Sequence, residues 1–510
     1  MSTMGYPPLC TEKRSSPNTT DPQFPRWVFQ LDEICSGMEC AVLPYHCRRT
    51  YASRVTGHRM SAGTFFRSAT ARGDRVMNNA NVPAPSFFKG VRLIDPQAGV
   101  DAVADLLVTP EGVQQNPAVV PADAKHVDGT GLWALPGLVD IQVHFRQPGF
   151  EYKETIETGS AAALAGGICT VVVMPNTQPR LDTPDQVTFE AEEARRVRGI
   201  DLLVAAASTK NLDGKELTDH AALKGAGAIA ITDDGFPVLD DDLMRGSLQL
   251  CAQNDLLFMQ HAEDIRMTQH APMTDSPVSV ALGVRGQSSD AEGVMVERDI
   301  ALTRETGARY HVLHTSTARS MTAIRAAKAE GLSVTCEVSP HHLLLTYDAC
   351  ASGDPNTKMN PPLRSEYDRQ ALVAALADGT VDAVATDHAP HAKDEKAKGF
   401  EDAPFGVIGL ETAFAALLSF VHDGTITDTR AVELMTSGPA SLLGLQGQLG
   451  TLSKDAPVHL TLVDPNREWT VTEEAMAGKS TNSAFLGHVF KGKVVATVLH
   501  GELRYADGLA

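Results

Sequence analysis

The chain has 510 residues and a formal net charge of −19, with 43% hydrophobic and 21% charged residues, so it has room for one large globular domain and a smaller one. Its negative charge argues against nucleic acid as a partner, because phosphate binding needs a basic surface. No apolar run approaches the ~20 residues that a membrane-spanning helix requires.

The first 82 residues differ in composition from the rest. Seven arginines and a single acid lie between residues 48 and 75. A transit peptide has this bias, but no amphipathic helix is evident. A metal site is a second interpretation, and its candidates are Cys35, Cys40, His46 and Cys47. Their spacing fits no zinc template. We therefore expect residues 1–82 to be a disordered or spurious extension, with Met77 as a candidate true start.

Eight cysteines are scattered through the chain without a paired spacing. No secretory signal is evident, and a chain this long does not need a disulfide framework. The sequence predicts reduced thiols and a cytoplasmic protein.

Short strands bounded by turn residues are predicted near both ends of the folded part. They are Phe88–Ile94, Val103–Val108, Val458–Val463 and Lys493–His500. Strand-rich ends that flank one central body predict a small β-sandwich domain made from residues 83–135 and 440–510.

Strands and alanine-rich helical stretches alternate over residues 136–439, which indicates βα units and a parallel sheet. The predicted strands are Gly137–His144, Thr170–Met174, Asp201–Ala206, Ala228–Ile231, Leu256–Gln260, Arg309–Leu313, Ser333–Glu337 and Asp382–Ala385. Eight units over about 300 residues fit a (β/α)8 barrel of the TIM type. A doubly wound sheet needs the same alternation, so the count alone does not decide between them.

Polar side chains follow nearly every one of these strands. They are Gln142 and His144, Asn176, Asp233 and Asp234, His261, His314, His341 and His342, then Asp387, His388 and His391. Each has an ordinary structural explanation; Asp-Asp-Gly, for example, is usually a turn. Within the first strand, alternation places Asp140, Gln142 and His144 on one face. Because the carboxyl ends of barrel strands meet at one mouth, the recurrence predicts a single site there.

Histidine and aspartate together form a ligand set for zinc or a similar divalent ion, and a carboxylate can bridge two ions. Such a pair of ions would supply hydroxide near neutral pH. A neighbouring aspartate would take the proton of the water and pass it to a leaving nitrogen. This chemistry predicts hydrolysis of an amide without a covalent enzyme intermediate. No Gly-x-Ser-x-Gly motif lies beside a predicted strand, so the sequence does not indicate a serine nucleophile.

The ordered motifs resemble the class I, or bacterial-type, dihydroorotases of the amidohydrolase superfamily, over roughly residues 85–508. The first group is Pro136-Gly-Leu-Val-Asp-Ile-Gln-Val-His-Phe-Arg, Met174-Pro-Asn-Thr, Asp233-Asp-Gly and His261-Ala-Glu-Asp. The second group is His314-Thr-Ser-Thr-Ala, Lys358-Met-Asn-Pro-Pro-Leu-Arg, Thr386-Asp-His-Ala-Pro-His and Gly409-Leu-Glu-Thr-Ala. The resemblance implies a metallo-dependent hydrolase barrel.

The family pattern implies a role for each matching residue. His144 and Asp387 would hold one zinc ion. His261 and His314 would hold a second, and Asp234 would bridge the two. Asp387 would also be the general acid and base.

A second set of residues would bind the carboxylate that distinguishes dihydroorotate from neutral cyclic amides. The resemblance assigns this role to Arg146, Asn176, Asn360 and His391. An arginine fork with amide donors suits a planar anion.

One position departs from the family pattern, because Gln142 stands where the family has the first histidine of a His-x-His pair. An amide oxygen is a poorer zinc ligand than imidazole. Three outcomes follow: an active enzyme with altered metal occupancy, a slower one, or a non-catalytic homologue. Retained activity is favoured, because the three ligands of the second ion, the acid/base and the substrate-binding residues are still present.

The resemblance implies dihydroorotase activity, which interconverts (S)-dihydroorotate and N-carbamoyl-L-aspartate in pyrimidine synthesis. It also implies a homodimer, with aspartate carbamoyltransferase as a further partner. Two rivals are a catalytically impaired scaffold for that transferase and a sister cyclic amidohydrolase such as a hydantoinase or allantoinase. The sister enzymes usually bridge their metals with a carboxylated lysine, where this chain has Asp233 and Asp234.

Overall fold

The computed structural model describes residues 85–509. The extension predicted over residues 1–82, with its candidate metal site at Cys35, Cys40, His46 and Cys47, lies outside the described residues.

Eight parallel strands form the central sheet. They are β6 (Leu138–Val143), β7 (Ile168–Val173), β8 (Asp201–Ala207), β9 (Ala228–Thr232), β10 (Leu257–Gln260), β13 (Arg309–Val312), β14 (Val334–Val338) and β15 (Ala383–Val384). They neighbour one another in chain order from β6 to β15. Every predicted barrel strand is confirmed, with its bounds shifted by one or two residues at most.

The sheet curls until its first and last strands meet. Val143 forms a parallel bridge with His388, just after β15, and the His144 amide donates to the His388 carbonyl at 2.8 Å. The side chain of Asp140 accepts hydrogen bonds from both the amide and the hydroxyl of Thr386. These contacts join β6 to the end of β15. The sheet is therefore a near-closed barrel and not an open doubly wound sheet.

The sequence prediction for β6 is wrong in one detail. Its pairing with β7 is irregular between Asp140 and Val143. Ile141 packs in the barrel interior, whereas Val143 packs in the outer core against the helices. Strict alternation of faces therefore does not hold at the end of this strand.

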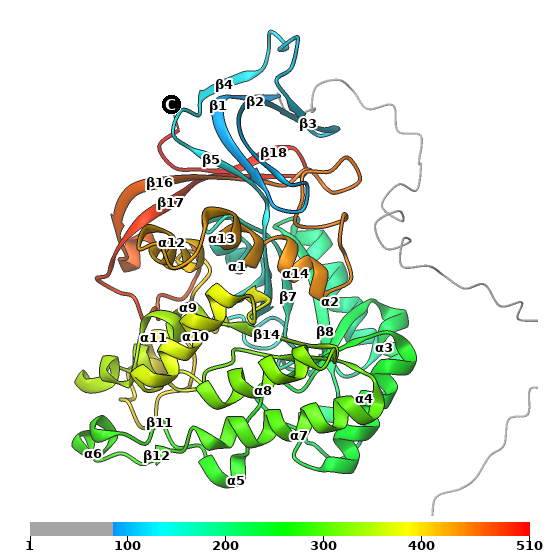
Figure 1. The fold of residues 1–510 in the computed structure, drawn as a ribbon, viewed down its shortest axis with the longest axis vertical. Helices are drawn as coiled ribbons and strands as arrows, with labels where there is room; N and C mark the ends of the chain where they lie inside the picture. The colour runs from blue at the N-terminus through cyan, green and yellow to red at the C-terminus, as the bar shows by residue number, and fades with distance from the viewer. Residues whose placement is uncertain (1–84, 510) are drawn as a thin grey trace, which may run out of the picture. The chain divides into compact units, whose positions relative to one another are not determined.

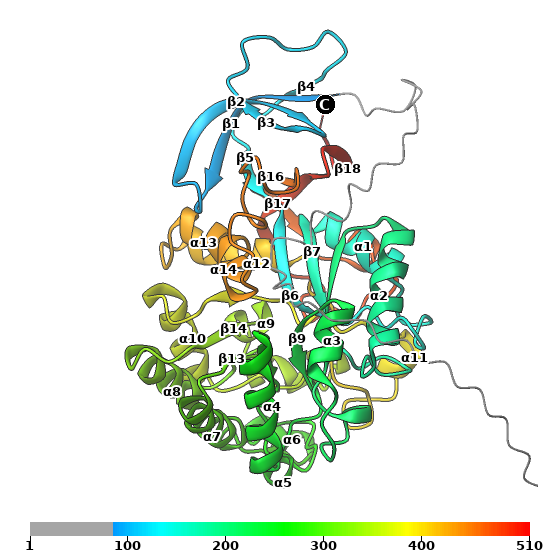
Figure 2. The same cartoon turned by 90° about the vertical axis from the view of Figure 1, so that its right-hand side faces the viewer.

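Helices surround the barrel, as Figures 1 and 2 show. The longer ones are α1 (Ile156–Ala165), α2 (Pro184–Val197), α3 (His220–Ala226), α4 (Asp241–Asn254), α7 (Asp290–Thr306), α8 (Ala318–Ala329), α10 (Glu366–Asp378), α12 (Ala413–His422) and α13 (Asp428–Leu434). The short ones are α5 (Ile265–Thr268), α6 (Pro277–Leu282), α9 (Pro340–Leu344), α11 (Lys393–Lys396) and α14 (Ser437–Leu442). Local chemistry sets their ends: Thr155 and Thr158 form a capping box at α1, and Gly307, with φ of +69°, ends α7.

A second sheet is mixed and uses both ends of the described chain. Its strands are β1 (Ser86–Asp95), β2 (Val100–Thr109), β3 (Gly112–Gln115), β4 (Lys125–Asp128), β5 (Trp133–Pro136), β16 (Leu460–Thr470), β17 (Val489–Leu499) and β18 (Glu502–Ala506). The order is β18-β17-β16-β5-β1-β2-β3, with β4 also on β1. The blue and red strands of Figure 1 share this sheet. The prediction that both ends build one β-structure is confirmed.

The two sheets pack around separate apolar cores. Small alanines line the barrel interior, among them Ala205, Ala230 and Ala383, and leave space for larger side chains at its mouth. Phe88, Leu106 and Val498 lie in the core of the mixed sheet. The barrel is therefore a filled scaffold that presents side chains at one end.

Across residues 85–509, no helix combines the length and apolar character needed to cross a membrane. Cys169, Cys251, Cys336 and Cys350 are buried free thiols. These four agree with the predicted reduced state.

Candidate active site

Five of the predicted residues gather at the carboxyl ends of the barrel strands. We call them the His/Asp cluster, and they are His144, Asp234, His261, His314 and Asp387. All five are buried. They come from five different strand ends, which the barrel brings to one mouth.

The carboxylate of Asp234 lies between the histidines of the cluster. Its Oδ2 is 3.2 Å from His144 Nε2. Its Oδ1 is 3.5 Å from both His261 Nδ1 and His314 Nε2. On the other side, Asp387 Oδ1 is 3.1 Å from His144 Nε2. The cluster thus consists of two groups of three ligand atoms that share Asp234.

Hydrogen bonds outside the cluster orient two of the imidazoles. Asn176 Oδ1 lies 2.9 Å from His144 Nδ1, which leaves His144 Nε2 to face the carboxylates. Glu263 Oε2 lies 3.1 Å from His261 Nε2, which leaves Nδ1 to face Asp234. Such partners are the usual means of fixing the tautomer of a metal-binding histidine.

Sequence reasoning missed Glu263. It accepts a 2.8 Å hydrogen bond from Asn360 Nδ2 as well as contacting His261. The only sequence signal is its place two residues after His261 in His-Ala-Glu-Asp. Glu337 of β14 was missed too; it is buried 3.2 Å from His311 Nε2, and burial raises its pKa to about 8.

The cluster attracts positive charge. Burial lowers the pKa of His144, but hydrogen bonds to Asp234 and Asp387 outweigh it and raise the pKa to about 9. Burial also disfavours protonated His261, yet Asp234 and Glu263 raise its pKa to about 10. Burial opposes ionisation of Asp234 in turn, but its three histidine partners lower its pKa well below the usual range. The site is therefore built to hold cationic charge against a buried carboxylate.

Backbone strain accompanies these side chains. His314 and Asp387 have φ values of +30° and +50°, and Arg146 has +61°. Residues other than glycine rarely adopt this left-handed conformation, and it concentrates at functional sites. The strained backbone conformation occurs at the three residues whose side chains it directs.

Gln142 is fully buried at the end of β6. Among the described residues, neither its Oε1 nor its Nε2 has a hydrogen-bond partner. An unpaired buried amide costs about 1–3 kcal/mol. Its backbone amide is held by Asp140 Oδ1 at 3.1 Å, so the position itself is fixed.

Arg146 and His391 lie together beside the cluster. Arg146 Nε donates to the Pro390 carbonyl at 3.2 Å, and its Nη2 is 3.5 Å from His391 Nε2. Burial lowers the pKa of Arg146 to about 10. Burial and the charges of Arg146 and Lys153 lower the pKa of His391, which stays neutral. The result is a cationic patch next to the His/Asp cluster.

Other polar residues after the strands lie outside the cluster. Asp233 Oδ1 accepts from the amides of Ser208 and Thr209 at 2.8 and 3.0 Å, which makes it a buried loop anchor. His341 and His342 belong to α9, where His342 Nε2 meets the Pro361 carbonyl at 2.9 Å. The contact with Pro361 gives the burial of His342 a structural explanation.

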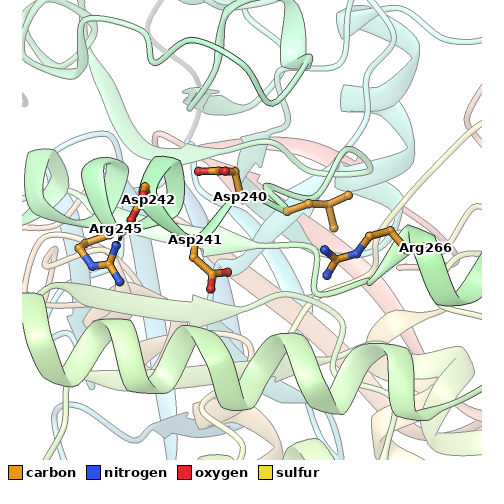
Figure 3. A pocket seen from close by; sticks show the side chains of 6 residues that line it. Asp240, Asp241, Asp242, Arg245 and Arg266 are labelled. Carbon is orange, nitrogen blue, oxygen red and sulfur yellow. Dashed lines mark hydrogen bonds and ion pairs between the residues drawn. The ribbon is translucent and has the colours of Figure 1, made fainter.

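A surface pocket at the start of α4 has a different character. Its lining residues are Leu239, Asp240, Asp241, Asp242, Arg245 and Arg266 (Figure 3). Asp240 caps the helix by accepting from the Leu243 amide at 2.8 Å, and exposed ion pairs hold the neighbouring arginines. Helix capping accounts for these acids, and no cluster residue lines the pocket.

The buried donor set suits a divalent cation, and the cationic patch beside it suits a carboxylate. The family described as "Dihydro-orotase-like" matches residues 131–320. The chain is 42% identical to a dihydroorotase of Solibacter usitatus over 83% of its length and 98% of that protein. It is also 42% identical to one of Elusimicrobium minutum, with the same two coverages.

Solved structures of similar fold include other cyclic amidohydrolases. The L-hydantoinase of Arthrobacter aurescens matches with a TM-score of 0.75 and 26% identity, over 84% of this chain and 97% of that one. The dihydropyrimidinase of Brevibacillus agri matches with a TM-score of 0.72 and 23% identity, over 83% and 95%. The second likeness concerns the fold alone.

Proposed function

The chain belongs to the dihydroorotase family of the amidohydrolase superfamily, and from this premise we propose that the His/Asp cluster is its zinc site and catalytic centre. The reaction is the reversible hydrolysis of (S)-dihydroorotate to N-carbamoyl-L-aspartate. The observation that carries the proposal is the Asp234 carboxylate, which lies within 3.5 Å of an imidazole nitrogen from each of three strands.

The residues present fit zinc. Imidazole nitrogens and carboxylate oxygens are its usual ligands outside thiolate sites. Each of the two groups in the cluster offers three ligand atoms that lie within 4.8 Å of one another. His144 and Asp387 would hold one ion, His261 and His314 a second, and Asp234 both. When bound, zinc supplies a Lewis acid and lowers the pKa of water.

Asp387 is the acid and base of the proposed reaction. One of its carboxylate oxygens already contacts His144 Nε2 at 3.1 Å, while no backbone hydrogen bond ties the other down within residues 85–509. It would take a proton from the attacking water and deliver it to the ring nitrogen as the amide bond breaks. The barrel mouth holds this carboxylate in place for both transfers.

The cationic patch would bind the substrate carboxylate. Arg146 supplies the charge and the planar fork, and Asn176 keeps its amide NH2 as a donor because its oxygen is engaged by His144. Asn360 and His391 complete the proposed set. The patch would hold an anionic ring with its amide toward Asp387. A neutral ring would not be held in this orientation.

The neighbours Asp233 and Asp234 provide a matched test of the zinc site. We expect Asp234→Asn to lose at least half of its bound zinc and roughly 100-fold in kcat/KM, because its carboxylate serves both ions. Asp233→Asn should keep its zinc and remain within a few-fold of wild type, since burial already raises the pKa of Asp233 to about 7 and favours an uncharged group. Zinc is counted by elemental mass spectrometry and dihydroorotate hydrolysis by absorbance. Normal zinc and activity in Asp234→Asn would refute the assignment.

Arg146→Gln tests the carboxylate site. Loss of a charge-assisted hydrogen bond of about 1.5–3 kcal/mol corresponds to a roughly 10- to 100-fold higher KM for dihydroorotate, with a smaller change in kcat. Arg146→Lys should recover part of this loss, because it keeps the charge without the fork. Slow hydrolysis of neutral dihydrouracil serves as the control. An equal loss on both substrates would contradict a role in binding the anion.

A further inference from the structure

A second group of metal-binding side chains lies at the opposite end of the barrel strands from the His/Asp cluster. Asp201 begins β8, His459 immediately precedes β16, and His500 immediately follows β17. Their ligand atoms all lie within 4.8 Å of one another. Asp201 belongs to a barrel strand and the two histidines to the mixed sheet, so the group lies where the two sheets meet.

The geometry directs both imidazoles at one carboxylate. His500 Nε2 is 2.9 Å from Asp201 Oδ1, and His459 Nε2 is 3.4 Å from Asp201 Oδ2. The two rings lie edge to face with centroids 4.7 Å apart. Each histidine therefore presents the same nitrogen to a common point.

Backbone hydrogen bonds hold His459 and the residues next to both histidines. The Gly137 amide donates to the His459 carbonyl at 3.0 Å, and the Gly501 amide donates to the Val458 carbonyl at 2.9 Å. Leu460 pairs with Val498 in the sheet, which places the two histidines on adjacent strand ends. His459 directly precedes β16, and His500 lies in the turn between β17 and β18.

His459 supplies an independent indication of a ligand. Its side chain is 4% exposed, and within the described part of the chain its Nε2 has no hydrogen-bond partner although it faces Asp201. A buried imidazole nitrogen left without a partner is rare in folded proteins.

One side of the group faces solvent. The side chain of Asp201 is 27% exposed and that of His500 is 56% exposed. Two imidazoles, one carboxylate and an open fourth position form a common zinc coordination pattern. We propose that Asp201, His459 and His500 bind a divalent zinc ion that joins the barrel to the mixed sheet, separate from the catalytic site.

The test counts zinc in full-length protein stripped with a chelator, reloaded with zinc chloride and desalted. The variants are His500→Asn and Asp201→Asn. Asparagine tolerates the left-handed backbone of His500, where φ is +51°, so this variant keeps the turn. The matched control is His270→Asn, because His270 is also exposed and also has a positive φ, of +56°, but belongs to no ligand group in residues 85–509.

We expect both variants to bind one zinc ion fewer per chain than wild type, and His270→Asn to bind the full number. Dihydroorotate hydrolysis should stay within about two-fold of wild type in all three. Added zinc should raise the unfolding temperature of the Asp234→Asn variant. This rise should be absent in the double variant that carries both Asp234→Asn and His500→Asn.

Equal zinc contents in wild type, His500→Asn and Asp201→Asn would overturn the proposal and leave an ion-pair cluster that stabilises the junction. This result is distinct from failure of the catalytic assignment, which appears in Asp234→Asn alone.

Discussion

Replacing Asp387 with asparagine is expected to reduce the kcat for dihydroorotate hydrolysis by about 10³-fold, within the 10²–10⁴-fold range typical of a lost general acid or base. The side chain keeps its size but can no longer accept a proton from water and return it to the ring nitrogen. Purified Asp387→Asn and wild-type protein are compared by single-turnover and steady-state absorbance assays.

The structure makes this substitution a clean one. Asp387 has φ of +50°, and asparagine is among the residues that best tolerate this conformation, so the backbone should not move. His144 keeps its hydrogen bond to Asn176 and its contact with Asp234. We therefore expect an unfolding temperature close to that of wild type.

Zinc content separates the two roles proposed for Asp387. A large loss of rate with most of the zinc retained would favour the acid and base role. A parallel loss of both would assign Asp387 chiefly to metal binding. Retention of more than a tenth of the wild-type kcat would contradict the proposed mechanism.

Replacing Gln142 with histidine is expected to raise both zinc content and turnover. The imidazole would add a strong ligand next to His144, and a change of this kind typically alters metal affinity roughly 10- to 100-fold. At limiting zinc we expect the occupancy of the His/Asp cluster to rise from about one ion towards two, and kcat to rise roughly ten-fold. Zinc titration followed by elemental analysis measures the first, and the absorbance assay the second.

Gln142→Leu is the control for this position. In the described residues the amide of Gln142 has no hydrogen-bond partner, so an apolar side chain of similar size should raise the free energy of unfolding by about 1 kcal/mol. If the amide holds no metal, zinc content stays at the wild-type value in Gln142→Leu. Unchanged zinc and turnover in Gln142→His would show that this position lies outside the metal site.

The barrel was predictable because its strands are short apolar runs with clear ends. Ile168–Val173 is buried and Asp201–Ala207 is buried or half-buried, and a helix separates each of them from the next strand. The site was predictable because parallel strands bring their carboxyl ends together, which unites residues as distant as His144 and Asp387.

Three features were not predicted, and two of them depend on contacts across the chain. The irregular pairing of β6 ends at Val143, which bridges to His388, far along the sequence. Pro340 begins a helix directly after β14 and carries His341 and His342 with it. The group of Asp201, His459 and His500 depends on how the mixed sheet docks onto the barrel, which no local pattern encodes.

Because β5 pairs with β16, the mixed sheet cannot be completed on the ribosome until β16 has been synthesised. Trp133 pairs with Val463, and Pro136 pairs with Leu460. The N-terminal strands of the mixed sheet therefore have one unpaired edge while the barrel is being translated. An unpaired edge of this kind invites contact with other chains. This edge of β5 is covered only after β16 has been synthesised.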